Sequence, residues 1–375
     1  MRQRTAGLPL GSPPVEPTNS PEPPAPLPMF ERPSHPDGHH RVTAPGGYEW
    51  WYFDAESPDG RDRFVAILFE GFVFHPGYLR RDAAFRKQPT KVPPVTGRDF
   101  PCAYCCTYRD GKIVRQFMTQ VKPDAFDASP DEPRVRVGDC TLEPVDGGLR
   151  LKLSGTPWHL TARGPQLDVK RTLTADVTFR PTLENDPAER VFLSREMTGE
   201  HHGWIPAAPR CEVTGTVDGK PFSGRGYHDH NYGTGPLDAG LKRWIWGRVL
   251  TDDGTTSFHV AEARDAKLPR EEHFFRLTAG GFEELPTKGL KLNWSRKSGA
   301  FLPYPAAVDF PGKLSLTSPT IVDASPFYLR LTYRATLDGR PARDAFCEVG
   351  HPGRLRWPIL GRMIEMSVDK RQARP

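Results

Sequence analysis

The side chains with the most evident chemical potential follow one another in one ten-residue segment, Gly224-Arg225-Gly226-Tyr227-His228-Asp229-His230-Asn231-Tyr232-Gly233. Because successive side chains of a strand point to opposite faces, Asp229 would share one face with Tyr227 and Asn231, and both histidines would lie on the other. A single carboxylate beside a phenol and an amide is a poor metal site. In an apolar pocket it would serve as an acid, because burial raises the pKa of a carboxyl. The alternative is a strand end where Asp and Asn bind nearby backbone groups.

Five aromatic residues crowd a second segment, Gly46-Gly47-Tyr48-Glu49-Trp50-Trp51-Tyr52-Phe53-Asp54. On a strand, Glu49 and Trp51 would lie on one face, and Trp50 and Tyr52 on the other. One face could then fill a core while the other lines a cavity, although large rings are often only core. Glu49 stands out because a carboxylate within an aromatic run must be paired, exposed or functional.

A third segment, residues 243–248, places Trp244 and Trp246 on one face of an expected strand. Paired indoles suit either a core or the wall of a channel for a long apolar ligand. Their π faces would also stabilise a developing positive charge.

Histidine and cysteine pairs give little support for a metal centre, and we expect none. His39-His40 and His201-His202 are adjacent, and adjacent side chains on a strand diverge from each other. The six cysteines form neither a paired zinc spacing nor a secretory disulfide pattern, so a structural role is expected for Cys102, Cys105, Cys106, Cys140, Cys211 and Cys347.

The elements that position these segments are predicted to be short strands joined by tight turns. Asp-Gly pairs allow the positive φ values of hairpins, and they occur at Asp110-Gly111, Asp146-Gly147, Asp218-Gly219 and Asp338-Gly339. Residues 80–87 are the one helical candidate, because no segment shows a long 3.6-residue apolar period. The pattern predicts an all-β protein with two antiparallel barrels or sandwiches.

The chain has 375 residues, which exceeds the usual limit of a single hydrophobic core and predicts two domains. Residues 1–40 are rich in proline and are expected to be disordered or extended. Asn185-Asp186-Pro187 interrupts the strand rhythm, which predicts an N-terminal domain over 41–190 and a C-terminal domain over 191–375.

The charge and hydropathy of the chain bear on whether it binds nucleic acid or a membrane. Lys and Arg number 51 and Asp and Glu number 46, with both signs mixed, which does not favour nucleic acid as a partner. No run approaches the length of a membrane span and no signal peptide is evident, so a cytoplasmic protein is expected. Peripheral contact with a membrane stays open.

These segments together resemble one family, the carotenoid 1,2-hydratases (hydroxyneurosporene synthases) of the lipocalin-like superfamily. The resemblance is carried by Pro45-Gly46-Gly47-Tyr48-Glu49-Trp50-Trp51-Tyr52-Phe53-Asp54-Ala55, by Gly226-Tyr227-His228-Asp229-His230-Asn231-Tyr232-Gly233 and by Arg243-Trp244-Ile245-Trp246. It implies two lipocalin-like barrels packed together and cofactor-free addition of water to a terminal double bond of an acyclic carotenoid or other isoprenoid. The proton donor proposed for the family falls on Asp229.

The chemistry of such a hydration would give roles to the neighbours of that acid. Tyr227 or Asn231 would stabilise its protonated form, and His228, His230 or Tyr52 would hold the attacking water. The expected binding surface for the hydrophobic substrate comprises Glu49, Trp50, Trp51, Tyr227, Asn231, Trp244 and Trp246. Two alternatives stay open: a pericyclase that folds a polyene in a shaped cavity, and a carrier that binds a lipid or pigment without reaction.

Overall fold

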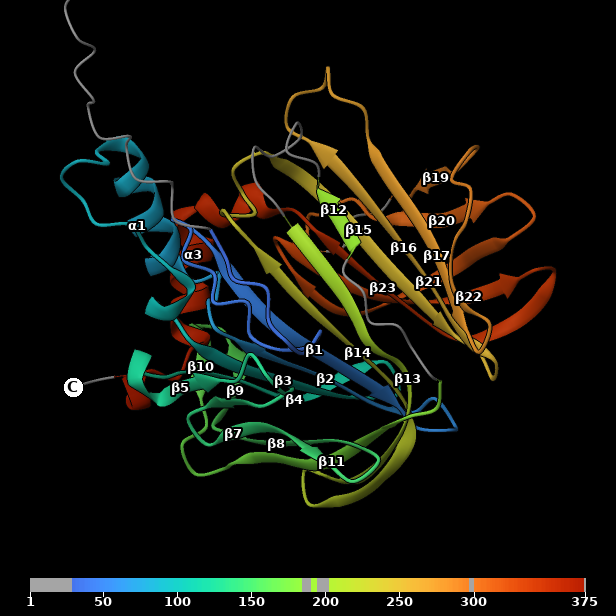
Figure 1. Cartoon of the computed structure of the whole chain (residues 1–375), viewed down its shortest axis with the longest axis horizontal. Coiled ribbons are helices and arrows are strands. Elements are labelled where there is room, and N and C mark those ends of the chain that lie inside the picture. Colours follow the sequence, from blue (N-terminus) through green and yellow to red (C-terminus); the bar gives the residue numbers. More distant parts are fainter. Residues whose placement is uncertain (1–28, 184–189, 194–201, 297–299, 374–375) are drawn as a thin grey trace, which may run out of the picture.

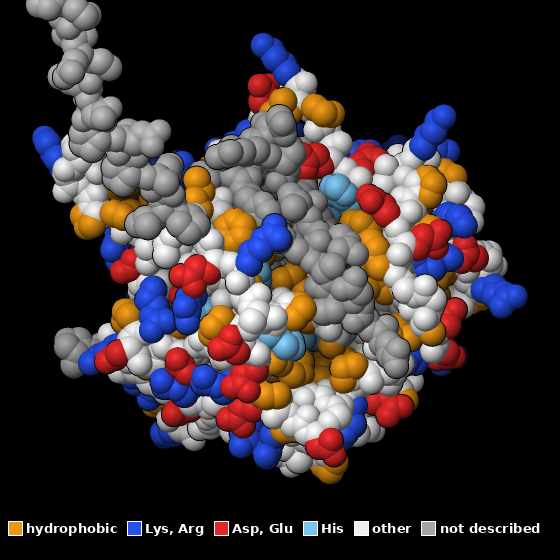
Figure 2. Space-filling model, viewed as in Figure 1, with side chains coloured by type: hydrophobic (Ala, Val, Ile, Leu, Met, Phe, Trp, Pro, Cys, Tyr) orange, Lys and Arg blue, Asp and Glu red, His pale blue; other side chains and the backbone are white. Residues whose placement is uncertain are grey.

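Two curled antiparallel sheets make up most of the protein (Figure 1). The computed structural model describes residues 29–183, 190–193, 202–296 and 300–373. No helix in this described part combines the length and apolar character needed to cross a bilayer. Figure 2 shows acidic and basic side chains interspersed over the visible face, as the mixed charges along the sequence predict.

The first sheet contains fourteen strands in the order β10-β9-β4-β3-β2-β1-β14-β13-β11-β8-β7-β6-β5, with β12 beside β13. Their bounds are β1 Tyr48–Glu56, β2 Asp62–Phe69, β3 Cys102–Arg109, β4 Lys112–Gln120, β5 Phe126–Ala128, β6 Val135–Val137, β7 Cys140–Val145, β8 Gly148–Gly155, β9 Pro157–Thr161, β10 Gly164–Leu167, β11 Leu173–Pro181, β12 Arg190–Leu193, β13 His202–Val217 and β14 Lys220–Gly233.

The second sheet contains nine strands in the order β18-β17-β16-β15-β23-β22-β21-β20-β19. Their bounds are β15 Leu241–Leu250, β16 Gly254–Ala263, β17 Glu271–Thr278, β18 Gly281–Glu284, β19 Lys291–Trp294, β20 Pro305–Phe310, β21 Leu314–Ser325, β22 Tyr328–Leu337 and β23 Arg340–Gly350. The prediction of an all-β protein with two antiparallel halves is confirmed.

The hairpins form where the Asp-Gly pairs predict them. Asp110-Gly111 joins β3 to β4, and Asp218-Gly219 joins β13 to β14. All four of these residues have φ between 51° and 73°, the left-handed region that two-residue hairpin turns require.

Two α-helices lie together beside the first sheet (Figure 1). The helix predicted over residues 80–87 begins earlier, and α1 spans Pro76–Lys87 with the His75 side chain accepting a hydrogen bond from the Gly77 amide. The second helix, α3 (Pro358–Ser367), was not predicted, because ten residues give a weak periodic signal and depend on tertiary packing. An ion pair of 2.8 Å between Arg80 and Glu365 links the two helices.

The chain passes from the first sheet to the second after β14, not near residue 190 where the domain boundary was expected. β13 and β14, placed by the sequence pattern after residue 190, belong to the first sheet, and the second begins only with β15. Residues 184–189 and 194–201, on either side of the expected boundary at residue 190, lie outside the described residues.

Part of the N-terminal segment, residues 1–40, is packed against the protein, although the whole segment was expected to be disordered or extended. Residues 1–28 lie outside the described part of the chain, but residues 37–40 are buried against the first sheet. The His39 amide donates to the Ser129 carbonyl and the Glu31 amide to the His40 carbonyl. Proline-rich composition disfavours regular structure, yet it did not prevent this short stretch from packing.

Three large apolar clusters fill the described structure. One lies inside the first sheet around Trp51 and Phe53, and one inside the second around Phe258 and Phe310. The third includes residues of both sheets and of both helices, and it positions the site described below. All six cysteines are buried and unbonded to one another, in accord with a structural role.

Candidate active site

A cavity of about 400 Å³ lies between the two sheets. Strands β1, β2, β4, β14, β15 and β16 and helix α3 all contribute to its wall. Its lining is rich in aromatic side chains: Trp50, Tyr52, Phe69, Phe72, Phe74, Tyr104, Trp158, Trp244, Trp246, Phe327 and Tyr328. Such a surface suits a long, flat apolar ligand.

Antiparallel pairing of β1 with β14 brings two of the predicted segments together. Tyr52 lies directly opposite Asp229, and Trp50 lies opposite Asn231. Because directly opposed residues of neighbouring strands point to the same face, all four side chains reach the cavity. Glu49, by the same alternation, faces away from it.

Asp229 is a buried carboxyl in the cavity wall, with 4% of its surface exposed. Its Oδ2 accepts hydrogen bonds from Tyr227 Oη at 2.7 Å and Trp204 Nε1 at 2.8 Å, and its Oδ1 accepts one from Asn231 Nδ2 at 2.8 Å. Burial raises the pKa of Asp229 to about 6, although these donors oppose the rise. Roughly a tenth of the Asp229 side chains would therefore be protonated at pH 7, far more than for an exposed aspartate.

These hydrogen bonds correct one expectation. Tyr227 and Asn231 were expected to favour the protonated acid, but both donate to carboxylate oxygens and so favour the ionised form. Loss of water contact is the effect that keeps a proton on Asp229. The two neighbours instead orient the carboxyl group.

Tyr52 and Trp246 meet across the two sheets, with ring centroids 5.5 Å apart in an edge-to-face arrangement. Among the described residues, neither Tyr52 Oη nor Trp246 Nε1 has a hydrogen-bond partner, although both are buried. Burial raises the pKa of Tyr52 well above its usual value, so its hydroxyl keeps its proton. Both atoms are therefore available to a bound water or a polar ligand group.

The tryptophans predicted to bind substrate divide between the two faces. Trp50, Trp244 and Trp246 line the cavity. Trp51 is fully buried in the core of the first sheet, where it stacks on His230 at 4.4 Å. Trp51 was predicted to bind substrate, but from this core it does not reach the cavity.

The two histidines beside Asp229 also lie away from the cavity. His228 Nε2 contacts Asp37 Oδ2 at 2.9 Å, and His230 Nε2 contacts Glu49 Oε1 at 2.8 Å. All four side chains are buried behind β1 and β14. A water at Asp229 is thus out of reach of both histidines, and Glu49 does not touch the cavity where it was expected to bind substrate.

Three residues of the cavity and its wall were not among the predicted site residues. Trp204 on β13 donates to the carboxyl, while His202 and His259 line the cavity. Burial, with His273 and His202 nearby, lowers the pKa of His259 well below its usual value, so its imidazole is neutral. Their signals in the sequence are weak: His202 stands out only as half of a histidine pair, and Trp204 is an isolated tryptophan two residues later.

A second polar group lies in the cavity wall on β22 and β23. Arg330 Nε donates to Glu348 Oε1 at 3.1 Å, and its Nη1 donates to the hydroxyls of Tyr104 and Tyr108 at 2.7 and 2.9 Å. Burial raises the pKa of Glu348, although Arg330 opposes the rise. Within the described part of the chain, the cavity wall therefore holds two buried carboxyls, Asp229 and Glu348, and a less buried one, Asp323. Arg330 pairs with Glu348 and Asp323, whereas Asp229 accepts only from uncharged donors.

Sequence comparison relates the chain to one protein family. The sequence profile of the family described as carotenoid hydratase CrtC matches residues 66–375. The acyclic carotenoid 1,2-hydratase of Cereibacter sphaeroides is 31% identical over 313 residues, covering 81% of this chain and 98% of that protein. The hydroxyneurosporene dehydrogenase of Chlorobaculum tepidum is 27% identical over 325 residues, covering 78% of each chain.

Structural comparison supports the fold. The crystal structure of a Nitrosomonas europaea protein described as an AttH covers 92% of this chain and 99% of that one, with a TM-score of 0.53 and 15% sequence identity. At this identity the likeness concerns the paired-sheet, lipocalin-like architecture alone.

Proposed function

Because the chain belongs to the carotenoid hydratase CrtC family, we propose that it adds water to a terminal carbon–carbon double bond of an acyclic carotenoid, with Asp229 as the acid. One observation carries the proposal: a buried carboxyl with a raised pKa lies in the wall of an aromatic cavity. Such a group can donate a proton where an exposed aspartate, ionised at neutral pH, cannot.

The first step is transfer of the Asp229 proton to the less substituted carbon of the double bond. The alkene π electrons form the new C–H bond, and the neighbouring carbon becomes a tertiary cation. The ring faces of Trp50, Trp244 and Trp246 would stabilise this cation, each by about 2 kcal/mol or more in a site without water. The carboxylate left on Asp229 is stabilised by its three hydrogen-bond donors.

The second step is attack of a water oxygen on the cation, followed by loss of one proton from that oxygen. The Tyr52 hydroxyl and the Trp246 indole offer buried polar atoms that could orient the water. The neutral imidazole of His259, or the carboxylate of Asp229 itself, can accept the proton. The net reaction consumes one alkene and one water and yields a tertiary alcohol.

The Asp229→Asn variant tests the assignment of the acid. The amide keeps the shape of the side chain but has no acidic proton, so hydration should fall at least about 100-fold. The purified variant would be incubated with lycopene or neurosporene, and the product analysed by mass spectrometry for the gain of one water. Absorbance and tryptophan fluorescence would show whether the carotenoid still binds.

Glu348→Gln is the matched control, because Glu348 is the other buried carboxyl of the cavity. It should keep most of the turnover. The reverse result, an active Asp229→Asn and an inactive Glu348→Gln, would move the acid to Glu348. Unchanged turnover in both variants would contradict acid catalysis by either buried carboxyl and would favour a cyclase or a carrier.

We also propose that the cavity opening docks on a lipid surface, from which a carotenoid would enter. Leu160, in the cavity lining, is 66% exposed, and Ile359 on α3 is 71% exposed. The inner side of α3 contributes Leu360 and Ile364 to the same lining. Exposed apolar residues beside an apolar cavity are suited to contact with a membrane.

A flotation assay with vesicles of phosphatidylcholine and phosphatidylglycerol tests this docking. Ile359→Asp should reduce the vesicle-bound fraction several-fold, because a charge at the contact opposes burial in lipid. Val145→Asp, at an exposed apolar residue outside the cavity lining, should leave binding unchanged. The proposed membrane contact would be wrong if the native chain does not bind vesicles. It would also be wrong if the native chain and both variants bind them equally.

A further inference from the structure

Seven buried ionisable side chains gather behind β1 and β14, on the face opposite the cavity. They come from the N-terminal segment, from β1, from the residue after β2 and from β14: Asp37, His39, His40, Glu49, Glu70, His228 and His230. None of them takes part in the proposed hydration. So dense a buried group of carboxylates and imidazoles, among which no Lys or Arg is present, calls for a positive charge, which either protonated imidazoles or a bound cation would supply.

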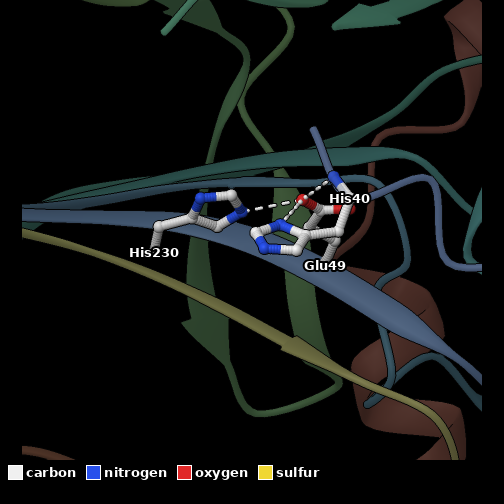
Figure 3. A group of neighbouring side chains, drawn as sticks. All are labelled: His40, Glu49 and His230. Atoms are coloured by element: carbon white, nitrogen blue, oxygen red, sulfur yellow. Dashed lines mark hydrogen bonds and ion pairs between the residues drawn. The ribbon is translucent and has the colours of Figure 1, made fainter. Parts of the chain in front are cut away.

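The two oxygens of Glu49 have different surroundings. Oε1 accepts hydrogen bonds from the His40 amide at 2.8 Å and lies 3.1 and 2.8 Å from ring nitrogens of His40 and His230 (Figure 3). Oε2 has no hydrogen-bond partner among the described residues, although Glu49 is fully buried. One carboxylate oxygen is thus saturated, and the other retains its lone pairs.

The unpartnered oxygen faces two further ligand-type groups. His39 Nε2 lies 3.5 Å from Glu49 Oε2 and 3.1 Å from Glu70 Oε2. One ligand atom from each of these three residues lies within 4.8 Å of the other two. An ion bound to all three would need ligand distances of about 2.0–2.2 Å, which small side-chain adjustments around this group allow.

The expectation of no metal site at His39-His40 depended on strand geometry. Adjacent histidines diverge on a strand, but residues 39 and 40 lie before β1 and outside any strand. Both imidazoles therefore turn toward the same carboxylate, His40 to Oε1 and His39 to Oε2 of Glu49. Only the path of the N-terminal segment over the sheet makes this convergence possible.

The charges in this group also favour a cation. Glu49 and Glu70 bring two carboxylates together in a buried position, and the Arg98 guanidinium lies 4.0 Å from Glu70 Oε1. One imidazole nitrogen and two carboxylates form a donor set that zinc and related divalent ions accept. The side chains of His39 and Glu70 keep 7% and 6% exposure, so this edge of the group is not fully enclosed.

We propose that His39, Glu49 and Glu70 bind one divalent metal ion of the zinc class. The ion would fasten the N-terminal segment to β1 and to the end of β2, behind the strand that carries Tyr52. It would have a structural effect, since the cavity and Asp229 lie on the other face of these strands. The site is independent of the hydration chemistry.

Zinc titration of the full chain tests the site directly. Protein stripped with a chelator would compete for Zn²⁺ with a chromophoric indicator, and thermal unfolding would be followed with and without the ion. We expect one ion per chain and a higher melting temperature with zinc, because an ion that binds only the folded state stabilises it. Co²⁺ absorption in the visible range would report coordination by nitrogen and oxygen.

Variants locate the ion. His39→Gln and Glu70→Gln should each weaken zinc binding by roughly tenfold or more. His35→Gln, in the same N-terminal segment but outside the three ligands, should bind zinc as the native chain does. Absence of uptake by the native chain would show that protonated histidine alone balances these carboxylates, and would overturn the proposal. Uptake that neither ligand variant weakens would overturn it as well.

Discussion

At the scale of single residues, the site depends on opposing effects at Asp229. Three hydrogen-bond donors stabilise its ionised form, and burial stabilises its protonated form more strongly. The outcome is a carboxyl with a pKa near 6, which can lose and regain a proton at physiological pH. The same donors hold both carboxyl oxygens, so the proton is presented from a fixed position.

The pH dependence of hydration follows from this balance. Asp229 must be protonated to act, so kcat/KM should fall as pH rises through about 6, the folded pKa. Trp204→Phe removes a donor that favours the ionised form, so it should raise the pKa and move the falling limb to higher pH. Rates measured from pH 5 to 9 with both proteins check this. A limb that stays in place, or moves to lower pH, would contradict the role of Asp229.

At the scale of elements, the pairing of β1 with β14 creates the site. The two strands are far apart in the sequence, yet their register sets Tyr52 beside Asp229 and Trp51 beside His230. Because successive side chains of a strand point to opposite faces, every second side chain of β1 and β14 faces the cavity. The side chains between them face the buried histidine–carboxylate group. A shift of one residue would exchange these two sets of side chains.

Gly233, at the end of β14, supports this pairing through its lack of a side chain. A Cβ atom there would collide with the ring of Tyr48, which stacks on Trp50 at 5.0 Å and contacts His202 through its hydroxyl at 2.7 Å. Gly233→Ala should therefore destabilise the fold by about 1–3 kcal/mol and reduce turnover. Urea unfolding and the hydration assay measure both effects.

Gly280→Ala is the control for that substitution. Gly280 lies in an exposed turn between β17 and β18, where an added Cβ would meet only the Thr278 hydroxyl at ordinary contact distance. Its unfolding midpoint should stay close to the native value. If the two alanine variants have equal midpoints, the proposed crowding at Tyr48 is wrong.

At the scale of the whole molecule, the cavity exists because two sheets face each other and are fastened beside it. Arg248 on β15 is fully buried and donates to Asp54 Oδ2 on β1 at 3.0 Å and to Asp344 Oδ1 on β23 at 2.9 Å. The Asp54–Arg248 contact joins the first sheet to the second. It lies on the same face of β1 as Tyr52, and so fixes one boundary of the site.

Arg248→Met should destabilise the protein strongly, because it leaves buried carboxylates without their main cation. Loss of one partner of a buried ion pair costs about 3–5 kcal/mol, whereas an exposed pair contributes about 1 kcal/mol or less. Arg150→Met, which breaks the exposed pair with Asp176, is the comparison. Urea denaturation gives both free energies of unfolding. Similar losses in the two variants would contradict the importance of the link between the sheets.

The sequence by itself determined the strands, the Asp-Gly turns and the face on which each side chain of β1 and β14 lies. These are local properties: alternation and the backbone freedom of glycine act over a few residues. It also identified the family, and it singled out Asp229, Tyr52, Trp50, Trp244 and Trp246, all of which line the cavity.

Only the tertiary structure decided which face borders the cavity, because burial on both sides of a strand gives the same sequence pattern. It placed His228, His230, Glu49 and Trp51 behind the strands, and it brought Trp204 from β13 to Asp229. Contacts between segments so distant in the chain depend on how sheets pair and pack, which no short stretch of residues encodes.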